Sequence, residues 1–336
     1  MTSPDPKAVH ANAIVIDGVS PLARRREYLR LYSEGGVTCV AVTVAHELAA
    51  GETAKELGDW LRFLDGRPDL VLARTAGDVE RAKRDGKLAV VFHFQGTDQF
   101  EDDLSLVEAY RALGVRMVQL TYNVKNRVGD GCDERTDAGL SRFGVALVER
   151  LNANGIVVDC AHTGARTTMD AIEASSRPVV ISHANARAIL DTPRNITDDL
   201  ARAIARTGGL VGVNVVPYFV VRSGRPTIDQ LIAHVDHWVN VAGIDHVGLG
   251  FDYFDGQQPF ATDEEAERVW QAAVDSGRWN PATYPKPPHY YPEGLSTPAE
   301  MRSLTRRLLE RGYSGDDTAK ILGGNWMRVF RAVWGA

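Results

Sequence analysis

Residues 156–187, IVVDCAHTGARTTMDAIEASSRPVVISHANAR, are the stretch from which the fold of this chain is best deduced. The pattern predicts a strand, a helix and a second strand, and each strand ends on a histidine, His162 and His183. Apolar runs of β-branched residues are typical of buried parallel strands. Two imidazoles at neighbouring strand ends can share a metal ion. Alternatively, each histidine caps its own strand by bonding a local backbone group.

The composition is that of an ordinary globular chain: 336 residues, 44% hydrophobic and 24% charged. The length fits one large α/β barrel or two medium domains. A net charge of −6 argues against nucleic acid as the main ligand. No apolar run approaches the roughly 18–20 residues of a membrane helix, and the first residues do not read as a secretory signal. Three separated cysteines match no zinc-finger or redox spacing, so we expect a cytoplasmic enzyme without a membrane partner.

Eight apolar, strand-like runs alternate with amphipathic helical segments along the chain. The runs cover residues 13–20, 36–44, 88–95, 115–123, 157–161, 179–182, 210–216 and 246–253. This order favours a parallel (β/α)8 barrel, the TIM-barrel fold, over a doubly wound sheet. We therefore expect one barrel domain over residues 1–336, with a long loop or lid at about 254–297 and a helical closure at 298–336.

Alternation of side chains along the strands predicts which polar groups enter the barrel. His93 and Gln95 share one face of the third strand, and Cys160 and His162 are assigned to one face of the fifth. If Gln95 and His162 lie at the mouth, then His93 and Cys160 lie one layer deeper. Cys160 could serve as a nucleophile beside a histidine base, although a small buried residue is the favoured interpretation.

Three more polar residues complete the predicted ring of strand ends: Tyr122 after the fourth strand, His183 after the sixth and Asp252 near the end of the eighth. A barrel interior normally holds Val, Ile and Leu, so this many polar groups need partners or an ion. The sequence therefore predicts a site at the carboxyl ends of the strands.

Over nearly its whole length the chain resembles the renal or membrane dipeptidases, which are zinc-dependent barrel enzymes of the amidohydrolase type. The most specific segments are residues 158–162 (VDCAH), 182–187 (SHANAR), 193–195 (PRN) with 198–200 (DDL), 292–295 (PEGL) and 321–330 (ILGGNWMRVF). The resemblance implies a metal-dependent hydrolase barrel. It assigns one zinc site to His162 and His183, the anchoring of the substrate carboxylate to Arg194, and proton transfer to Asp252.

Other positions depart from the pattern of that family. Its first strand reads Asp-Gly-His-x-Asp and supplies two ligands to the other zinc, but here residues 17–21 read DGVSP, which puts Val19 and Pro21 at the ligand positions. The glutamate that bridges the two zincs in the family is replaced by Gln95, and the histidine of the fourth strand by Tyr122. We therefore expect no two-zinc centre.

A single divalent metal ion remains compatible with the residues, with zinc as the first choice and iron or copper as alternatives. His162 and His183 would supply two ligands, and Gln95 or the deeper His93 a third. Asp252 would bind the ion or stay beside it as a base.

The function that we expect is hydrolysis of a dipeptide or another small amide that carries a carboxylate. Arg194 would hold that carboxylate, and Tyr122 would bind substrate and donate a hydrogen bond to the developing oxyanion. The alternatives are a different metal-dependent enzyme on the same barrel, an oxidoreductase or a lyase, and an inactive homologue that binds a small molecule. A homodimer is also considered, because related barrels often pair.

Overall fold

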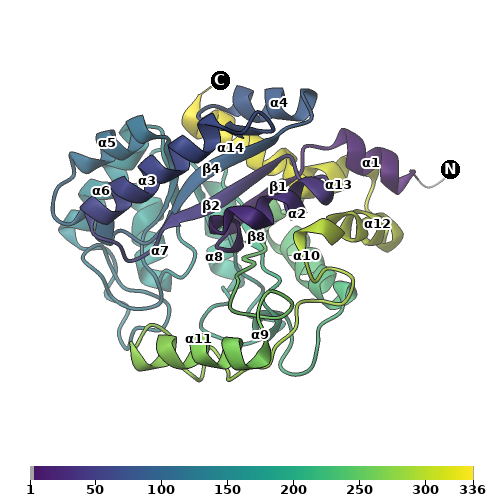
Figure 1. Ribbon diagram of the computed structural model, residues 1–336. Helices are drawn as coiled ribbons and strands as arrows, with labels where there is room; N and C mark the ends of the chain where they lie inside the picture. The colour runs from purple at the N-terminus through teal and green to yellow at the C-terminus, as the bar shows by residue number, and fades with distance from the viewer. Residues whose placement is uncertain (1–3, 336) are drawn as a thin grey trace.

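The computed structural model describes residues 4–335, in which parallel strands form a ring that is surrounded by helices (Figure 1). The strands are β1 (Ile16–Ser20), β2 (Cys39–Ala45), β3 (Leu70–Leu72), β4 (Leu88–Gln95), β5 (Val115–Gln119), β6 (Val157–Asp159), β7 (Val179–Val180), β8 (Val211–Val213) and β9 (Val247–Leu249). The α-helices are α1 (Pro6–Asn12), α2 (Leu29–Glu34), α3 (Ala50–Asp65), α4 (Ala76–Arg84), α5 (Leu106–Leu113), α6 (Arg142–Ala153), α7 (Ala165–Ala174), α8 (Asp198–Arg206), α9 (Pro217–Val220), α10 (Ile228–Ala242), α11 (Asp263–Asp275), α12 (Met301–Arg311), α13 (Gly315–Ala319) and α14 (Asn325–Trp334).

The ring closes through backbone hydrogen bonds between two groups of strands. The larger sheet runs in the order β1-β2-β4-β5-β6-β7, and β8 pairs with β9. The amide of Ile181 donates to Leu210 O at 3.0 Å, which joins β7 to β8. On the other side, the amide of Asp252 donates to Val19 O at 3.2 Å, which joins the end of β9 to β1. All eight predicted strands are present, and the α/β barrel is confirmed.

The barrel interior is apolar at the amino ends of the strands. One cluster of buried side chains combines inward-facing strand residues with residues of α14. Trp326 of α14 is fully buried and donates from Nε1 to Leu249 O at 2.9 Å. Figure 1 shows α14 at the end of the barrel opposite to α9 and α11. Helix α14 therefore closes the bottom of the barrel, and the mouth lies at the carboxyl ends of the strands.

Local sequence signals explain where the helices near the mouth begin. Thr227 and Thr262 precede α10 and α11, and each accepts a hydrogen bond from the amide three positions further along. Gln230 and Glu265 bond back to the amides of those threonines, which completes two capping boxes. Helix α11 belongs to residues 254–297, which we call the cover segment.

Two features differ from the predictions. Strand β3 was not predicted; it pairs with β4 beside the ring, at Leu70 and Leu88. The placement of Cys160 in the barrel interior is wrong. Its thiol contacts Thr168 of α7, in the layer between strands and helices. The inward residues of β6 are Val157 and Asp159, because the chain leaves extended geometry before it reaches His162.

Within residues 4–335, every helix is too short or too polar to span a lipid bilayer.

Candidate active site

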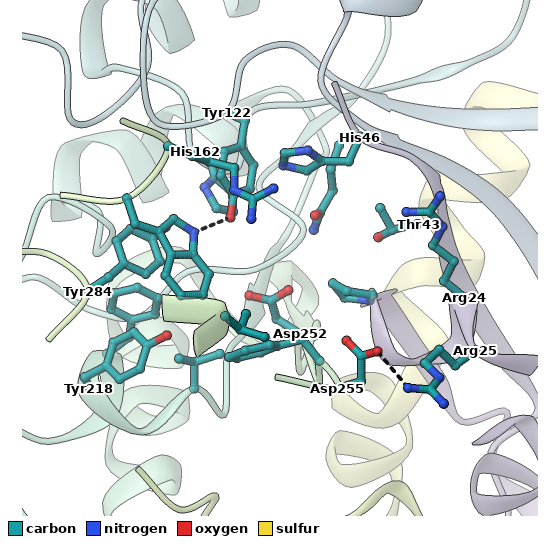
Figure 2. Close-up of a pocket in the computed structure, with 18 of the residues that line it drawn as sticks. Arg24, Arg25, Thr43, His46, Tyr122, His162, Tyr218, Asp252, Asp255 and Tyr284 are labelled. Atoms are coloured by element: carbon teal, nitrogen blue, oxygen red, sulfur yellow. Dashed lines mark hydrogen bonds and ion pairs between the residues drawn. The ribbon is translucent and has the colours of Figure 1, made fainter. Parts of the chain in front are cut away.

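A cavity of about 680 Å³ opens at the mouth of the barrel, between the strand ends and the cover segment. Figure 2 shows its two sides, with Asp252 between them. Tyr218 and Tyr284 stand on one side, whereas Arg24 and Thr43 stand on the other. We call the first side the aromatic wall; it consists of Tyr218, Phe219, Trp279 and Tyr284.

His162 and His183 face one another at the base of this cavity. Their Nε2 atoms lie 2.8 Å apart, and Asp252 Oδ2 lies 3.9 Å from His183 Nε2. One ligand atom from each of the three residues falls within 4.8 Å of the others. No other group of three His, Cys, Asp or Glu side chains in residues 4–335 comes together in this way. The structure thus brings together the two predicted histidines and the predicted aspartate.

The tautomer of His162 follows from its hydrogen bond to Asn123. Asn123 Nδ2 donates to Arg278 O at 3.1 Å, which fixes the orientation of the amide. Asn123 Oδ1 lies 2.7 Å from His162 Nδ1 and is an acceptor only, so Nδ1 carries the proton. Nε2 of His162 is therefore left with a lone pair.

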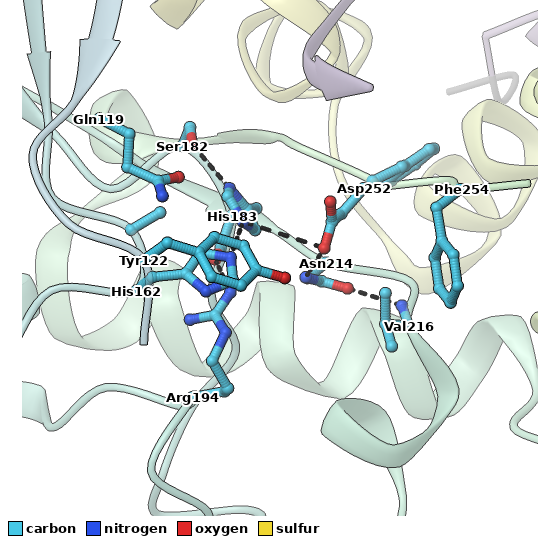
Figure 3. A network of polar contacts seen from close by, with 12 residues as sticks. Gln119, Tyr122, His162, Ser182, His183, Arg194, Asn214, Val216, Asp252 and Phe254 are labelled. Carbon is cyan, nitrogen blue, oxygen red and sulfur yellow. Dashed lines mark hydrogen bonds and ion pairs between the residues drawn. The ribbon is translucent and has the colours of Figure 1, made fainter. Parts of the chain in front are cut away.

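The tautomer of His183 follows from a similar argument (Figure 3). Ser182 Oγ donates its single proton to Asp159 Oδ2 at 2.5 Å, so it can only accept from His183 Nδ1 at 2.7 Å. Burial works against ionisation of Asp159, but hydrogen bonding and charge from His93, followed by His183 and Ser182, hold its pKa below the usual value. Nε2 of His183 therefore also keeps a lone pair.

Two lone pairs that face each other at 2.8 Å repel unless a cation lies near both. Burial, followed by the positive charge of Arg194, lowers the pKa of His162 and His183 well below the ordinary value, which disfavours an added proton. Neutral imidazoles with a carboxylate beside them are ligands that zinc and related divalent ions prefer. The donor set of His162, His183 and Asp252 therefore fits one divalent metal ion.

At the positions where the resemblance implies ligands of a second zinc, this chain lacks suitable donor atoms. Val19 is fully buried and Pro21 lines the cavity, and neither side chain has a donor atom for a cation. Asp17 precedes them on β1, but its Oδ1 accepts from the amide of Phe251 at 2.8 Å. Gln95 offers only a neutral oxygen, which bridges two dications poorly.

Asp252 is held at the centre of the site by a polar neighbour. Asn214 Nδ2 donates to Asp252 Oδ2 at 3.4 Å. Burial raises the pKa of Asp252 to about 7, although Arg194, Asn214 and Gln95 oppose the shift. A carboxyl group with a pKa near neutrality can both accept and release a proton at physiological pH.

Tyr122 covers His162 from the cavity side. The two rings stack with centroids 4.1 Å apart, and Trp279 Nε1 donates to the Tyr122 hydroxyl at 3.0 Å. Burial raises the pKa of Tyr122 to about 12, while the hydrogen bond from Trp279 opposes the shift. Tyr122 is therefore a neutral phenol whose proton is not used by Trp279.

Arg194 lies buried behind the histidine pair with little to neutralise it. Its Nη2 donates to His183 O at 3.4 Å, and its guanidinium lies 5.3 Å from the centroid of the Phe219 ring. It forms no ion pair within residues 4–335, and its Nε has no hydrogen-bond partner there. The carboxylates of Asp252 and Asp133 act on its charge only from beyond ion-pair distance. A buried cation without a directly paired carboxylate is costly, so the site suits an anionic group from outside.

Strained backbone marks the same place. Five non-glycine residues of the described chain have a positive φ, and three of them, Asn123, His162 and Asp252, belong to this site. Such conformations persist only where the surroundings impose them, and they cluster at functional sites.

Two remaining predictions concern Gln95 and His93. Gln95 lines the cavity and neighbours Asp252, as its position on the strand indicates. His93 lies deeper and outside the three-residue group, with its Nε2 3.2 Å from Asp159 Oδ2. This placement makes His93 a partner of Asp159, and its role as a metal ligand stays a prediction.

Sequence reasoning missed the residues that orient the two imidazoles: Asn123, Asp159 and Ser182. The only local signal was position in the sequence: Asn123 directly follows Tyr122, and Ser182 directly precedes His183. Asp159 had no such signal. Trp279 and Tyr284 of the aromatic wall lie in the long loop or lid expected at about 254–297, but their place in the site was not predicted.

Comparison with known proteins gives concordant matches. Residues 61–269 match the family described as membrane dipeptidase, peptidase family M19. An uncharacterized protein in the pqqA 5′ region of Klebsiella pneumoniae is 31% identical over 275 residues, which are 79% of this chain and 89% of that protein. The dipeptidase tcpJ of Claviceps purpurea is 27% identical over 86% of this chain and 61% of its own length. The crystal structure of an amidohydrolase from Pseudomonas aeruginosa superimposes with a TM-score of 0.90 at 33% identity, covering 99% of this chain and 100% of that one.

Proposed function

Since the chain belongs to the membrane dipeptidase family of dipeptidase-like, metal-dependent hydrolases, we propose that it hydrolyses a dipeptide or a similar small carboxylate-bearing amide with one divalent ion. The observation that carries the proposal is the pair of Nε2 lone pairs of His162 and His183, 2.8 Å apart and next to Asp252.

His162, His183 and Asp252 would hold the ion. When bound there, a divalent ion supplies the Lewis acidity that activates water and polarises a carbonyl oxygen. A carboxylate has two oxygens, so Asp252 can contact the ion with one and hold a proton on the other. Because Asp252 lies beside the reacting amide, this carboxylate would take a proton from the attacking water and pass it to the leaving amine.

The other residues bind and orient the substrate. Arg194 pairs with the substrate carboxylate, because its guanidinium is buried and has no ion-pair partner in the described chain. The Tyr122 hydroxyl accepts from Trp279 and turns its own proton towards the carbonyl oxygen, where negative charge develops. The aromatic wall excludes water from the reacting amide.

The decisive experiment combines metal analysis with a panel of dipeptides. We expect one zinc, iron or copper ion per chain. Hydrolysis should be lost when the metal is chelated and should return when metal is added. The His183→Ala variant should lose both the metal and the activity. His237→Ala is the control, since His237 pairs with Asp198 away from the cavity. Two ions per chain would contradict the single-ion site. A metal-loaded protein that cleaves no dipeptide would contradict the proposed activity.

A further inference from the structure

The side of the cavity opposite the aromatic wall holds buried polar groups that have no partner. Thr43 Oγ1 makes no hydrogen bond within residues 4–335. Gln95 Nε2 has no acceptor within 3.5 Å there, although the Gln95 amide interacts with the carboxyl group of Asp252. Each residue is only 3% exposed. Both line the cavity, and Figure 2 shows Thr43 on the side that faces away from Tyr218 and Tyr284. Unsatisfied buried groups are costly, and a ligand that supplies oxygen acceptors would remove that cost.

Arg24 adds a positive charge to the same side. It lines the cavity and stands next to Thr43 in Figure 2. Its one carboxylate neighbour in the described chain is Glu56, at 3.7 Å and without a hydrogen bond. We call Arg24, Thr43 and Gln95 the donor side, because each can donate to a ligand.

Three other arginines line the cavity. Arg278 lies beside Trp279 of the aromatic wall, 6.0 Å from its ring centroid, and its carboxylate neighbour is Glu47 at 3.9 Å. Arg25 contacts Glu27 at 2.9 Å and Asp255 at 3.5 Å. Arg26 lies over the rings of Trp60 and Phe63, with its guanidinium carbon about 5 Å from each centroid. Arg24, by contrast, has neither a hydrogen-bonded carboxylate nor an aromatic ring against its guanidinium in the described chain.

The position of Arg194 sets the direction in which a substrate would lie. Arg194 packs on Phe219 of the aromatic wall, so the part of the substrate that carries the anchoring carboxylate lies on that side. The amide to be cleaved lies over His162 and His183. The acyl part must then extend past Asp252 to the donor side.

We propose that the donor side binds a second carboxylate, carried by the acyl part of the substrate, so that the preferred substrate is an amide between an acidic acyl group and an apolar or aromatic amino acid. This inference rests on the proposed function for its direction, and deepens it by naming the substrate class. A carboxylate accepts from Thr43, Gln95 and Arg24 together, and charge-assisted hydrogen bonds are about twice as strong as neutral ones. The aromatic wall accommodates the side chain of the other residue.

The test compares glutamyl-phenylalanine with glutaminyl-phenylalanine, which differ in one charge and hardly in shape. For the wild-type protein we expect kcat/KM to be about tenfold or more higher for the glutamyl than for the glutaminyl substrate, because the charged carboxylate forms the stronger hydrogen bonds. Arg24→Gln should abolish that preference, mainly by lowering kcat/KM for the glutamyl substrate. Thr43→Val, which keeps the shape of the side chain, should weaken it. Arg30→Gln is the matched control, since Arg30 pairs with Glu34 on α2 outside the cavity. Equal rates for both substrates, or a preference that survives Arg24→Gln, would overturn the assignment.

Titration calorimetry of the same two dipeptides with chelator-treated wild-type and Arg24→Gln proteins separates this inference from the proposed function. If no dipeptide is hydrolysed but the glutamyl compound binds more tightly in an Arg24-dependent way, the donor side is confirmed and the proposed activity is wrong. If both dipeptides are hydrolysed and bind alike, the activity is confirmed and the donor side does not bind a carboxylate.

Discussion

At the level of single residues, the groups behind each imidazole decide what the site can bind. Asn123 accepts from one histidine and Ser182 from the other, and both bonds leave Nε2 free towards the cavity. Such partners orient a metal-binding histidine and raise its basicity.

Replacing Ser182 by alanine tests this role directly. The change removes the acceptor of His183 Nδ1 and a donor to Asp159, while the imidazole itself stays. We expect metal affinity to fall about 10- to 100-fold, as is usual when such a partner is lost. Competition with a chelator of known affinity measures the change. Ser33→Ala on α2 is the control, and equal affinity in both variants would mean that Ser182 does not orient the ligand.

A second prediction concerns the buried His234. It accepts from the amide of Ala186 at Nδ1 and donates from Nε2 to Val220 O, so only the neutral ring fits. Burial lowers its pKa from 6.5 to about 4, although the bond to Val220 opposes the shift. As the pH falls, His234 takes up a proton near pH 6.5 in the unfolded chain but only near pH 4 in the folded protein. The stability that neutral His234 contributes is therefore fully present above pH 6.5 and is lost as the pH falls from 6.5 to 4. The loss amounts to about 3 kcal/mol.

Thermal melts of wild type and His234→Gln between pH 4 and 7 measure this effect. The variant is less stable at neutral pH but should lose less stability on acidification. Parallel curves for the two proteins would show that His234 is not the titrating group.

The histidine pair was predictable because its signal is local: each histidine ends an apolar, β-branched run. The roles of Asn123 and Asp159 were not, since their partners come from other strands. The predicted orientation of Cys160 was wrong because it assumed that side chains alternate up to His162. His162 adopts a left-handed backbone conformation with a φ of 61°, which no sequence pattern predicts.

At the level of elements, the cover segment forms part of the site as well as its roof. Trp279 donates to Tyr122, and Tyr284 donates from its hydroxyl to Asn123 Oδ1 at 3.0 Å. Trp279 and Tyr284 also stack, with ring planes 5° apart. The segment therefore contacts both residues that hold His162. The sequence predicted a long loop or lid at about 254–297, but its contacts with residues 122 and 123 arise only in the folded barrel.

Trp279→Phe should separate these roles. The phenyl ring keeps much of the stacking on Tyr284 but lacks the donor to Tyr122. Loss of one hydrogen bond is worth about 1 kcal/mol, so we expect kcat to fall about fivefold with little change in KM. Tyr290→Phe, at an exposed position of the same segment, is the control. A rise in KM at constant kcat would indicate that Trp279 binds substrate and that its hydrogen bond to Tyr122 does not contribute to catalysis.

At the level of the whole molecule, the barrel depends on close contact between its first strand and its closing helix. A Cβ atom on Gly18 would lie 2.2 Å from Trp326 Cζ2 and 2.9 Å from Leu249 O. Position 18 therefore accepts only glycine without rearrangement. The eight strands were predictable from apolar runs, whereas this contact was not, because it joins residues that are about 300 positions apart.

Gly18→Ala should destabilise the protein by about 1–3 kcal/mol, the usual cost of overpacking a core. Urea unfolding gives the free energy. The control is Gly51→Ala on α3, where an added Cβ meets nothing within 4 Å and should stabilise the helix slightly. Equal free energies of unfolding for Gly18→Ala and wild type would show that Trp326 can move aside.

The seam between β9 and β1 also has a consequence for biosynthesis. Val19 and Asp252 meet across it, so the ribosome must add more than 230 residues after β1 before that strand finds its second neighbour. Trp326, which fills the space below the seam, emerges later still. During that interval the apolar interior of the half-built ring faces water, and such nascent chains are prone to aggregate. The protein should therefore depend on chaperones during translation, and a ribosome-arrested chain that ends before Trp326 should remain sensitive to protease along its whole length.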